Sequence, residues 1–326
     1  MKLATYKDGS RDGQLVVVSR DLSQAHHASA TATRLQQVLD DWNFLSPQLQ
    51  DLYVNLNQGR SRHAFSFDPQ QCMAPLPRAY QWVEGSAYGQ PPELPAQAQG
   101  ASDDFLGPCD PAWFADERWG IDFGAGLAAI TDDLETGADP DQALDSVRLL
   151  MLANSWHLRN LVRAGLAGAP SNSLATAAFS PVAVTPDELG PAWKGGRVHL
   201  TLQSALNGQK IGLCEAGPEM TWPFGPLISD LAKTRRLRAG SIVGTGPVSN
   251  RDAAKGFCCI ADKRAAETLR PGQAHSPYLR PGDTVRIEMK GLDGLSVFGA
   301  IEQAVAGPMG LNTDPPADAR GGESNA

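Results

Sequence analysis

The 326-residue sequence lacks the features that mark membrane, secreted and nucleic-acid-binding proteins. No apolar run approaches the roughly 20 residues that a helix needs to cross a bilayer. The first eight residues, MKLATYKD, lack the apolar block of a secretory signal. The net charge is −8, so phosphate neutralisation and attraction to anionic lipids are both disfavoured. We therefore expect a cytoplasmic protein that binds neither nucleic acid nor membrane.

Cysteine is scarce and irregularly spaced. The chain has five cysteines, and no two of them form a CxxC pair. This spacing argues against a thioredoxin-type motif and a structural zinc site, because both need paired thiols. We expect reduced thiols, as is usual in cytosolic proteins. The cysteines are Cys72, Cys109, Cys214, Cys258 and Cys259.

Glycine and proline, in contrast, are abundant, with 33 and 24 residues. These numbers favour a fold rich in loops and strands over a helical one. With 42% hydrophobic and 20% charged residues, the composition is that of a globular protein rather than a wholly disordered one. The length suggests two domains, or one large domain with an appendage.

The apolar pattern predicts a small N-terminal α+β domain over residues 1–73. Residues 15–18 (LVVV) are typical of a strand. Leu35, Val38 and Leu39 have the i, i+3, i+4 spacing of one helix face. The N-terminal domain should therefore combine a short sheet with a helix packed on it.

A proline-rich passage, APLPR at residues 74–78, marks the predicted domain boundary. We predict a larger second domain over residues 74–308. The remaining segment, residues 309–326, is rich in proline, glycine and charge, and we expect it to be disordered.

Within the second domain, residues 119–130 alternate like a strand but place glycines where side chains should point to one face. Asp139 and Pro140 are a typical helix start, and the apolar spacing extends the predicted helix past Met151 to a turn near Asn154. Later elements are a hairpin turning at Asn207-Gly208, a helix over residues 224–237, and strands over residues 241–243 and 283–289.

Five ordered blocks of sequence resemble bacterial fumarylacetoacetate hydrolase proteins. The blocks are PLPRAYQW at 75–82, SDDFLGP at 102–108, AFSPVAVTPDELG at 178–190, KTRRLRAGSIVG at 233–244 and SVFGAIEQ at 296–303. The resemblance implies a mixed β-roll catalytic domain behind the smaller N-terminal domain, usually in a homodimer. It also implies cleavage of a carbon–carbon bond in a 1,3-diketo acid, or decarboxylation or tautomerisation of related oxo acids. Carboxylates in such proteins hold Mg²⁺ or Ca²⁺.

The residues at the family's metal and catalytic positions differ from the family pattern. Gly124 and Gly126 stand where the family has a Glu-x-Glu strand motif, and Ser155 stands where it has an Asp ligand. Pro91 occupies the position of the catalytic His, and Leu174 falls near that of the family Lys. Because one carboxylate with hydroxyls and water binds a divalent ion poorly, we predict that no metal is bound here.

The first hypothesis is therefore a metal-independent enzyme acting on an oxo acid or polyketide-like acid by isomerisation, cyclisation or hydrolysis. Glu84, matching a further family Asp, and Glu302 are the predicted acid and base, and Arg159 is the predicted anchor for the ligand carboxylate. The other predicted binding residues are Tyr88, Ser155 and Ser249.

Two alternatives remain open. One is a pseudoenzyme that uses the scaffold only to bind a ligand or partner. The other is a conventional metal-dependent hydrolase whose metal site is rebuilt from Glu84, Asp103, Asp104 or Asp122. We also expect His157 to line a pocket or the surface, because side chains at i and i+2 of a helix diverge and keep it from Ser155.

Overall fold

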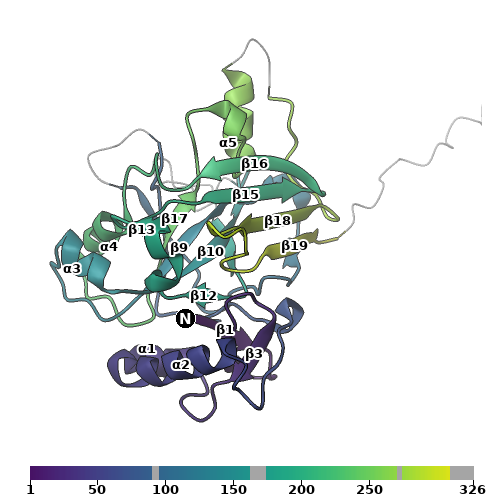
Figure 1. The fold of residues 1–326 in the computed structure, drawn as a ribbon. Coiled ribbons are helices and arrows are strands. Elements are labelled where there is room, and N and C mark those ends of the chain that lie inside the picture. Colours follow the sequence, from purple (N-terminus) through teal and green to yellow (C-terminus); the bar gives the residue numbers. More distant parts are fainter. Residues whose placement is uncertain (90–94, 162–173, 270–273, 309–326) are drawn as a thin grey trace, which may run out of the picture.

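The computed structural model describes residues 1–89, 95–161, 174–269 and 274–308. Its strands and helices confirm the predicted α+β class, with large sheets and few helices (Figure 1). Across these residues no helix is long and apolar enough to span a bilayer. Both the predicted tail and Pro91 lie outside the described residues.

The largest sheet runs through both parts of the chain. Within the described ranges it contains 12 strands in the order β4-β3-β2-β1-β12-β10-β9-β17-β5-β6, with β8 and β11 also pairing with β10. The strands are β1 (Lys2–Tyr6), β2 (Gln14–Val18), β3 (Gln24–His27), β4 (Phe65–Ser66), β5 (Trp82–Gly85), β6 (Gln97–Gly100), β8 (Ile121–Asp122), β9 (Ala125–Thr131), β10 (Val147–Leu158), β11 (Leu174–Phe179), β12 (Ala183–Val184) and β17 (Ile242–Pro247).

A five-stranded sheet in the order β16-β15-β18-β19-β7 lies beside it (Figure 1). Its β15–β16 hairpin turns at Asn207 and Gly208, whose φ angles of 49° and 75° are the positive values that a tight type I′ turn requires. The predicted hairpin is thus confirmed. The strands are β7 (Ala112–Trp113), β15 (Thr201–Leu206), β16 (Gln209–Glu215), β18 (Thr284–Met289) and β19 (Ile301–Ala306), and a separate pair is β13 (Trp193–Lys194) with β14 (Arg197–Val198).

The helices cover the sheets at separate places. In Figure 1, α1 and α2 lie along the N-terminal strands, α3 and α4 lie together on one side, and α5 stands next to β16. Leu35, Val38 and Leu39 form the buried face of α1, as predicted. The helices are α1 (Leu35–Asp40), α2 (Trp42–Asn57), α3 (Pro140–Asp145), α4 (Phe224–Ala232) and α5 (Ile260–Thr268), with 3₁₀ turns η1 (Pro69–Gln71), η2 (Glu117–Trp119), η3 (Pro186–Ala192) and η4 (Ala253–Lys255).

The predicted long helix beyond Asp139 is wrong in its second half. Asp139 does cap α3, accepting hydrogen bonds from the backbone N–H groups of Asp141 and Gln142. However, α3 ends at Asp145, and Val147 begins the twelve-residue strand β10. A strand buried on both faces has a nearly continuous apolar sequence, and periodicity cannot distinguish such a run from a buried helix.

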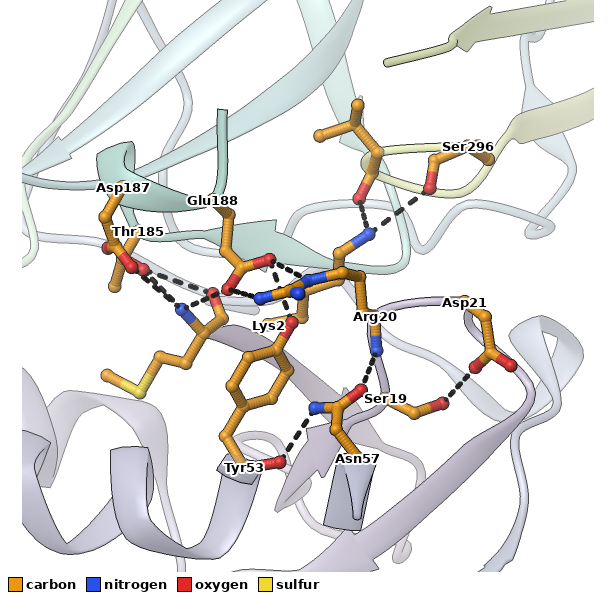
Figure 2. A network of polar contacts seen from close by, with 12 residues as sticks. Lys2, Ser19, Arg20, Asp21, Tyr53, Asn57, Thr185, Asp187, Glu188 and Ser296 are labelled. Carbon is orange, nitrogen blue, oxygen red and sulfur yellow. Dashed lines mark hydrogen bonds and ion pairs between the residues drawn. The ribbon is translucent and has the colours of Figure 1, made fainter. Parts of the chain in front are cut away.

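A polar network joins the N-terminal domain to the C-terminal domain (Figure 2). The Glu188 carboxylate of η3 accepts hydrogen bonds from Tyr53 Oη of α2 at 2.8 Å and from Arg20 Nε at 3.3 Å. Lys2 Nζ, from β1, donates to the carbonyl oxygens of Val297 at 2.7 Å and Ser296 at 3.2 Å. Burial lowers the pKa of Lys2 to about 8. The two domains therefore share buried charged groups as well as the continuous sheet.

We expect Glu188→Gln to lower the free energy of unfolding by about 1–3 kcal/mol, because it weakens several charge-assisted hydrogen bonds at once. Burial opposes ionisation of Glu188, but its cationic and hydroxyl partners outweigh this effect and hold its pKa below the ordinary value of 4.5. The stabilisation is thus present above pH 4.5 and lost as the pH falls through the lowered pKa. Urea unfolding at pH 7 and at decreasing pH measures both effects.

Asp187→Asn is the matched control, because the Asp187 side chain is exposed and lies 3.8 Å from the Met1 amino group. Exposed ion pairs contribute about 0–1 kcal/mol, so this variant should unfold nearly as the wild type does. Equal losses for Glu188→Gln and Asp187→Asn would contradict the role of Glu188 as the centre of the network.

Candidate functional site

A cavity of about 470 Å³ is lined by the end of β10, the strands β5 and β17 with the loops that follow them, and the start of α5. We call it the β10 cavity. Its size is that of a small-molecule site. Its polar lining residues include Glu84, Tyr88, His157, Arg159, Ser249 and Asp262.

A carboxylate and an imidazole meet in the β10 cavity. Oε2 of Glu84, on β5, lies 3.2 Å from Nε2 of His157, near the end of β10. Both residues are buried, with exposed fractions of 8% and 6%. Within the described residues, Oε1 of Glu84 is buried and has no hydrogen-bond partner. A buried acceptor left without a donor costs about 1–3 kcal/mol, so the Glu84 carboxylate is only partly satisfied by its surroundings.

An ion pair lies beside this contact. Arg159 lines the cavity, and its Nε donates to Oδ2 of Asp122 on β8 at 3.0 Å. The Asp122 carboxylate also accepts the backbone N–H groups of Ile260 at 2.6 Å and Ala261 at 3.1 Å, at the start of α5. Burial raises the pKa of Asp122, while Arg159 and these N–H groups oppose the rise. Asp122 therefore has donors on both oxygens.

The cavity also contains a thiol, Cys259, immediately before α5. Burial raises the pKa of this thiol well above its ordinary value. Because the thiolate is the nucleophile and the metal ligand, Cys259 is poorly suited to either role near neutral pH.

Four of the predicted site residues come together in the β10 cavity: Glu84, Tyr88, Arg159 and Ser249. Tyr88 Oη donates to the carbonyl oxygen of Ala216 at 2.7 Å. Burial raises the pKa of Tyr88 far above its usual range, so the phenol stays protonated. Its ring is therefore a fixed wall of the cavity.

Glu302 does not lie in the β10 cavity, contrary to the prediction. Its side chain is 61% exposed on β19 and pairs with Arg286 of β18, outside the β10 cavity. Because side chains alternate along a strand, the neighbouring Gln303 points inward instead, and its Oε1 accepts a hydrogen bond from Trp156 Nε1 at 3.2 Å. Glu302 is thus not placed to act as the acid or base of this cavity.

Ser155, predicted to bind the ligand, is also absent from the cavity lining. It lies on β10, is 2% exposed and does not line the cavity. The pairing of β10 with β11 shifts register between Trp156 and His157, and such a bulge redirects side chains. His157 lines the cavity, as expected, but from a strand rather than a helix. The sequence interpretation did not place His157 next to Glu84. Assigning residues 147–158 to a strand would have made this contact possible to predict.

The carboxylates considered for a rebuilt metal site do not gather. Asp103 and Asp104 are exposed and lie outside the cavity lining, and Asp122 is held by Arg159 and two N–H groups. Leu174, near the family Lys position, begins β11.

Gly124 and Gly126 are closely packed rather than facing open space. A Cβ atom at Gly126 would lie 2.2 Å from the carbonyl oxygen of Gly246, and one at Gly124 would lie 3.0 Å from that of Ser155 and 3.1 Å from Pro247 Cγ. Contacts of this kind leave no room for a longer side chain without backbone movement. The end of β17 therefore occupies the space that carboxylate side chains would need.

Fold and site define a two-domain α+β protein with a buried carboxylate–imidazole contact in its C-terminal part. Residues 1–78 match the family model "Fumarylacetoacetase N-terminal domain 2", and residues 77–306 match "Fumarylacetoacetate (FAA) hydrolase C-terminal". The chain belongs to the fumarylacetoacetate hydrolase family, and the resemblance noted from the sequence is confirmed.

Solved structures share the fold at low sequence identity. Fumarylacetoacetate hydrolase from Exiguobacterium antarcticum is 17% identical with a TM-score of 0.66, covering 94% of this chain and 99% of that one. For 5-carboxymethyl-2-hydroxymuconate delta-isomerase from Mycobacterium smegmatis the values are 14%, 0.60, 95% and 100%. For maleylpyruvate hydrolase from Sphingobium sp. SYK-6, in complex with manganese(II) and pyruvate, they are 14%, 0.65, 94% and 99%. Among curated protein sequences, none matches the chain.

The prediction that the protein uses no metal cofactor is corrected by the last of these structures. That maleylpyruvate hydrolase is a manganese complex, and the family is metal-dependent. In the described part of this chain, however, no group of three or more His, Cys, Asp or Glu side chains could hold a metal ion. The residues present at the family's ligand positions, Gly124, Gly126 and Ser155, do not fit one either.

The close packing at Gly126 predicts a stability effect. Gly126→Ala should lower the free energy of unfolding by about 1–3 kcal/mol or more, because its Cβ would overlap a backbone oxygen rather than a movable side chain. Gly124→Ala is the matched comparison, since its nearest contacts are longer. Chemical denaturation of both variants should rank Gly126→Ala as the less stable. The reverse order would contradict the close approach of the end of β17 to Gly126.

Proposed function

We propose that the protein is an enzyme that moves a proton on a small oxo acid, with Glu84 and His157 as the acid–base pair and Arg159 as the carboxylate anchor. The observation that carries the proposal is the state of Glu84: one oxygen contacts His157, and the other is buried in the cavity wall without a donor among the described residues. Similar solved structures named as a hydrolase and an isomerase support the substrate class.

The placement of His157 and Arg159 suits an oxo acid. His157 lies near the end of β10 and Arg159 just after it, and both line the cavity. A carboxylate held by Arg159 would thus present its adjacent carbonyl and α-carbon to the pair. Arginine binds carboxylates through two parallel N–H donors, and Arg159 uses its Nε–H on Asp122, which leaves the terminal nitrogens for the ligand.

The Glu84–His157 pair can hold and return a proton. A carboxylate base takes a proton from the carbon next to the carbonyl, which leaves an enolate, or from water, which leaves hydroxide. The adjacent imidazole stabilises the negative charge of the enolate or hydroxide. The burial of both groups strengthens their interaction, because little water screens it. Positioned acid–base groups typically accelerate reactions by about 10²–10⁴-fold. The same step serves an isomerisation, by returning the proton to another carbon, or a hydrolysis, by activating water.

Isomerisation, cyclisation and carbon–carbon hydrolysis remain open as the overall reaction. That the protein acts as a homodimer also stays a prediction. A ligand-binding protein without turnover is the remaining alternative, and the exchange experiment below separates it from an enzyme.

Exchange of the methyl protons of pyruvate in D₂O, followed by ¹H NMR, tests the acid–base pair without knowledge of the natural substrate. We expect the wild type to accelerate exchange and Glu84→Gln to reduce the enzymatic rate by about 10²–10⁴-fold, because the amide cannot accept the proton. Pyruvate binding should change much less than the rate.

Glu302→Gln is the matched control, since Glu302 lies outside the cavity and should leave the rate unchanged. Full exchange activity in Glu84→Gln would overturn the assignment. A wild type that binds pyruvate without any exchange would favour the binding protein over the enzyme.

A further inference from the structure

Asp122 is a completely buried carboxylate that does not itself line the β10 cavity. In the pairing of β8 with β10, it lies directly opposite His157. Side chains of directly opposite residues are neighbours on one face of a sheet. Asp122 therefore neighbours two cavity residues, His157 near the end of β10 and Arg159 just after it.

The contacts of Asp122 come from two different elements. Its Oδ1 accepts the N–H of Ile260 at 2.6 Å, and its Oδ2 accepts the N–H of Ala261 at 3.1 Å and the Nε–H of Arg159 at 3.0 Å. The first two donors belong to the start of α5, which also lines the cavity. One carboxylate thus fixes an arginine and a helix terminus relative to each other.

A buried charge of this kind is costly to desolvate and is weak as a source of stability alone. The main effect of such a carboxylate is that it fixes the positions of the groups that donate hydrogen bonds to it. An arginine side chain has about 2 kcal/mol of rotamer entropy, and a guanidinium held through Nε has lost most of that freedom before a ligand arrives. Preorganisation of this type increases affinity because the ligand does not have to order the side chain.

We propose that Asp122 is a positioning residue that holds the Arg159 guanidinium in the orientation that binds the substrate carboxylate. This inference rests on the proposed function, in which Arg159 is the anchor. Asp122 accepts the Nε–H and directs the terminal nitrogens of Arg159 into the β10 cavity, while α5 holds Asp122 from the other side. Asp122 therefore acts on the ligand only through Arg159.

A double-mutant cycle tests the dependence of one residue on the other. Calorimetric titration with pyruvate measures the Kd of the wild type, Asp122→Asn, Arg159→Gln and the double variant. We expect each single variant to bind about tenfold or more weakly, and the double variant to bind no more weakly than Arg159→Gln. A residue with only a structural role would instead add its own loss to that of Arg159→Gln.

Asp132→Asn is the matched control. Asp132 forms a comparable, partly buried ion pair with Arg148, away from the β10 cavity. This variant should lose stability in denaturation without any change in the Kd for pyruvate. A change in Kd comparable to that of Asp122→Asn would show that loss of an ion pair anywhere in the sheet weakens binding, and would overturn the proposal.

The outcomes separate this inference from the proposed function. If Arg159→Gln binds pyruvate as the wild type does, the anchor itself is wrong and the proposed function fails with it. If Arg159→Gln binds weakly while Asp122→Asn binds normally, or if the two losses are additive, only the positioning role fails.

A spectroscopic measurement covers the case in which Asp122→Asn does not fold or pyruvate does not bind. In wild-type protein with ¹⁵N-labelled arginine, the Arg159 Nε–H, assigned by its loss in Arg159→Gln, should exchange slowly with solvent because it is bonded to a buried carboxylate. An Arg159 Nε–H that exchanges as fast as those of exposed arginines would overturn the proposal.

Discussion

The pairing of β10 is the constraint on which the candidate site depends. This strand is hydrogen-bonded to β8, β9, β11 and β12, and eleven of its twelve residues are buried. Because its neighbours fix its register, the residues at its end have no freedom to move independently. His157 faces Glu84, and Arg159 meets Asp122, only while β8 and β5 stay in register with the same sheet. The sheet therefore acts as the rigid support that a site of this precision needs.

Local sequence patterns predicted those elements whose structure is decided locally. The Asp139 cap and the Asn207-Gly208 turn each need only a few residues to be stable, and both are present. The class of β10 is decided by its neighbours instead, so its apolar sequence was interpreted as a helix. That single error also hid the contact between His157 and Glu84, because the geometry of a helix kept His157 apart from the other candidate residues.

The candidate site was accessible from the sequence only in part, for a similar reason. Glu84, Tyr88, Arg159 and Ser249 lie outside the five blocks that carry the family resemblance, yet they line one cavity. Glu302 does lie in one of these blocks, residues 296–303, but the face on which its side chain emerges depends on the alternation of β19 against the rest of the sheet. The sequence suggests Asp122 only as a candidate metal ligand, because two of its three donors come from α5, 138 and 139 residues further along the chain.

The two buried carboxylates near β10 differ in how completely they are satisfied, and this difference assigns their roles. Asp122 has three N–H donors distributed over both oxygens. Both of its oxygens are therefore satisfied without a ligand, which suits a carboxylate that holds other groups in position. Glu84 has His157 on one oxygen and no donor among the described residues on the other. A buried acceptor in that state is stabilised by whatever brings a proton or a donor into the cavity. Ligand binding should therefore act on Glu84, while Asp122 keeps the anchor in place.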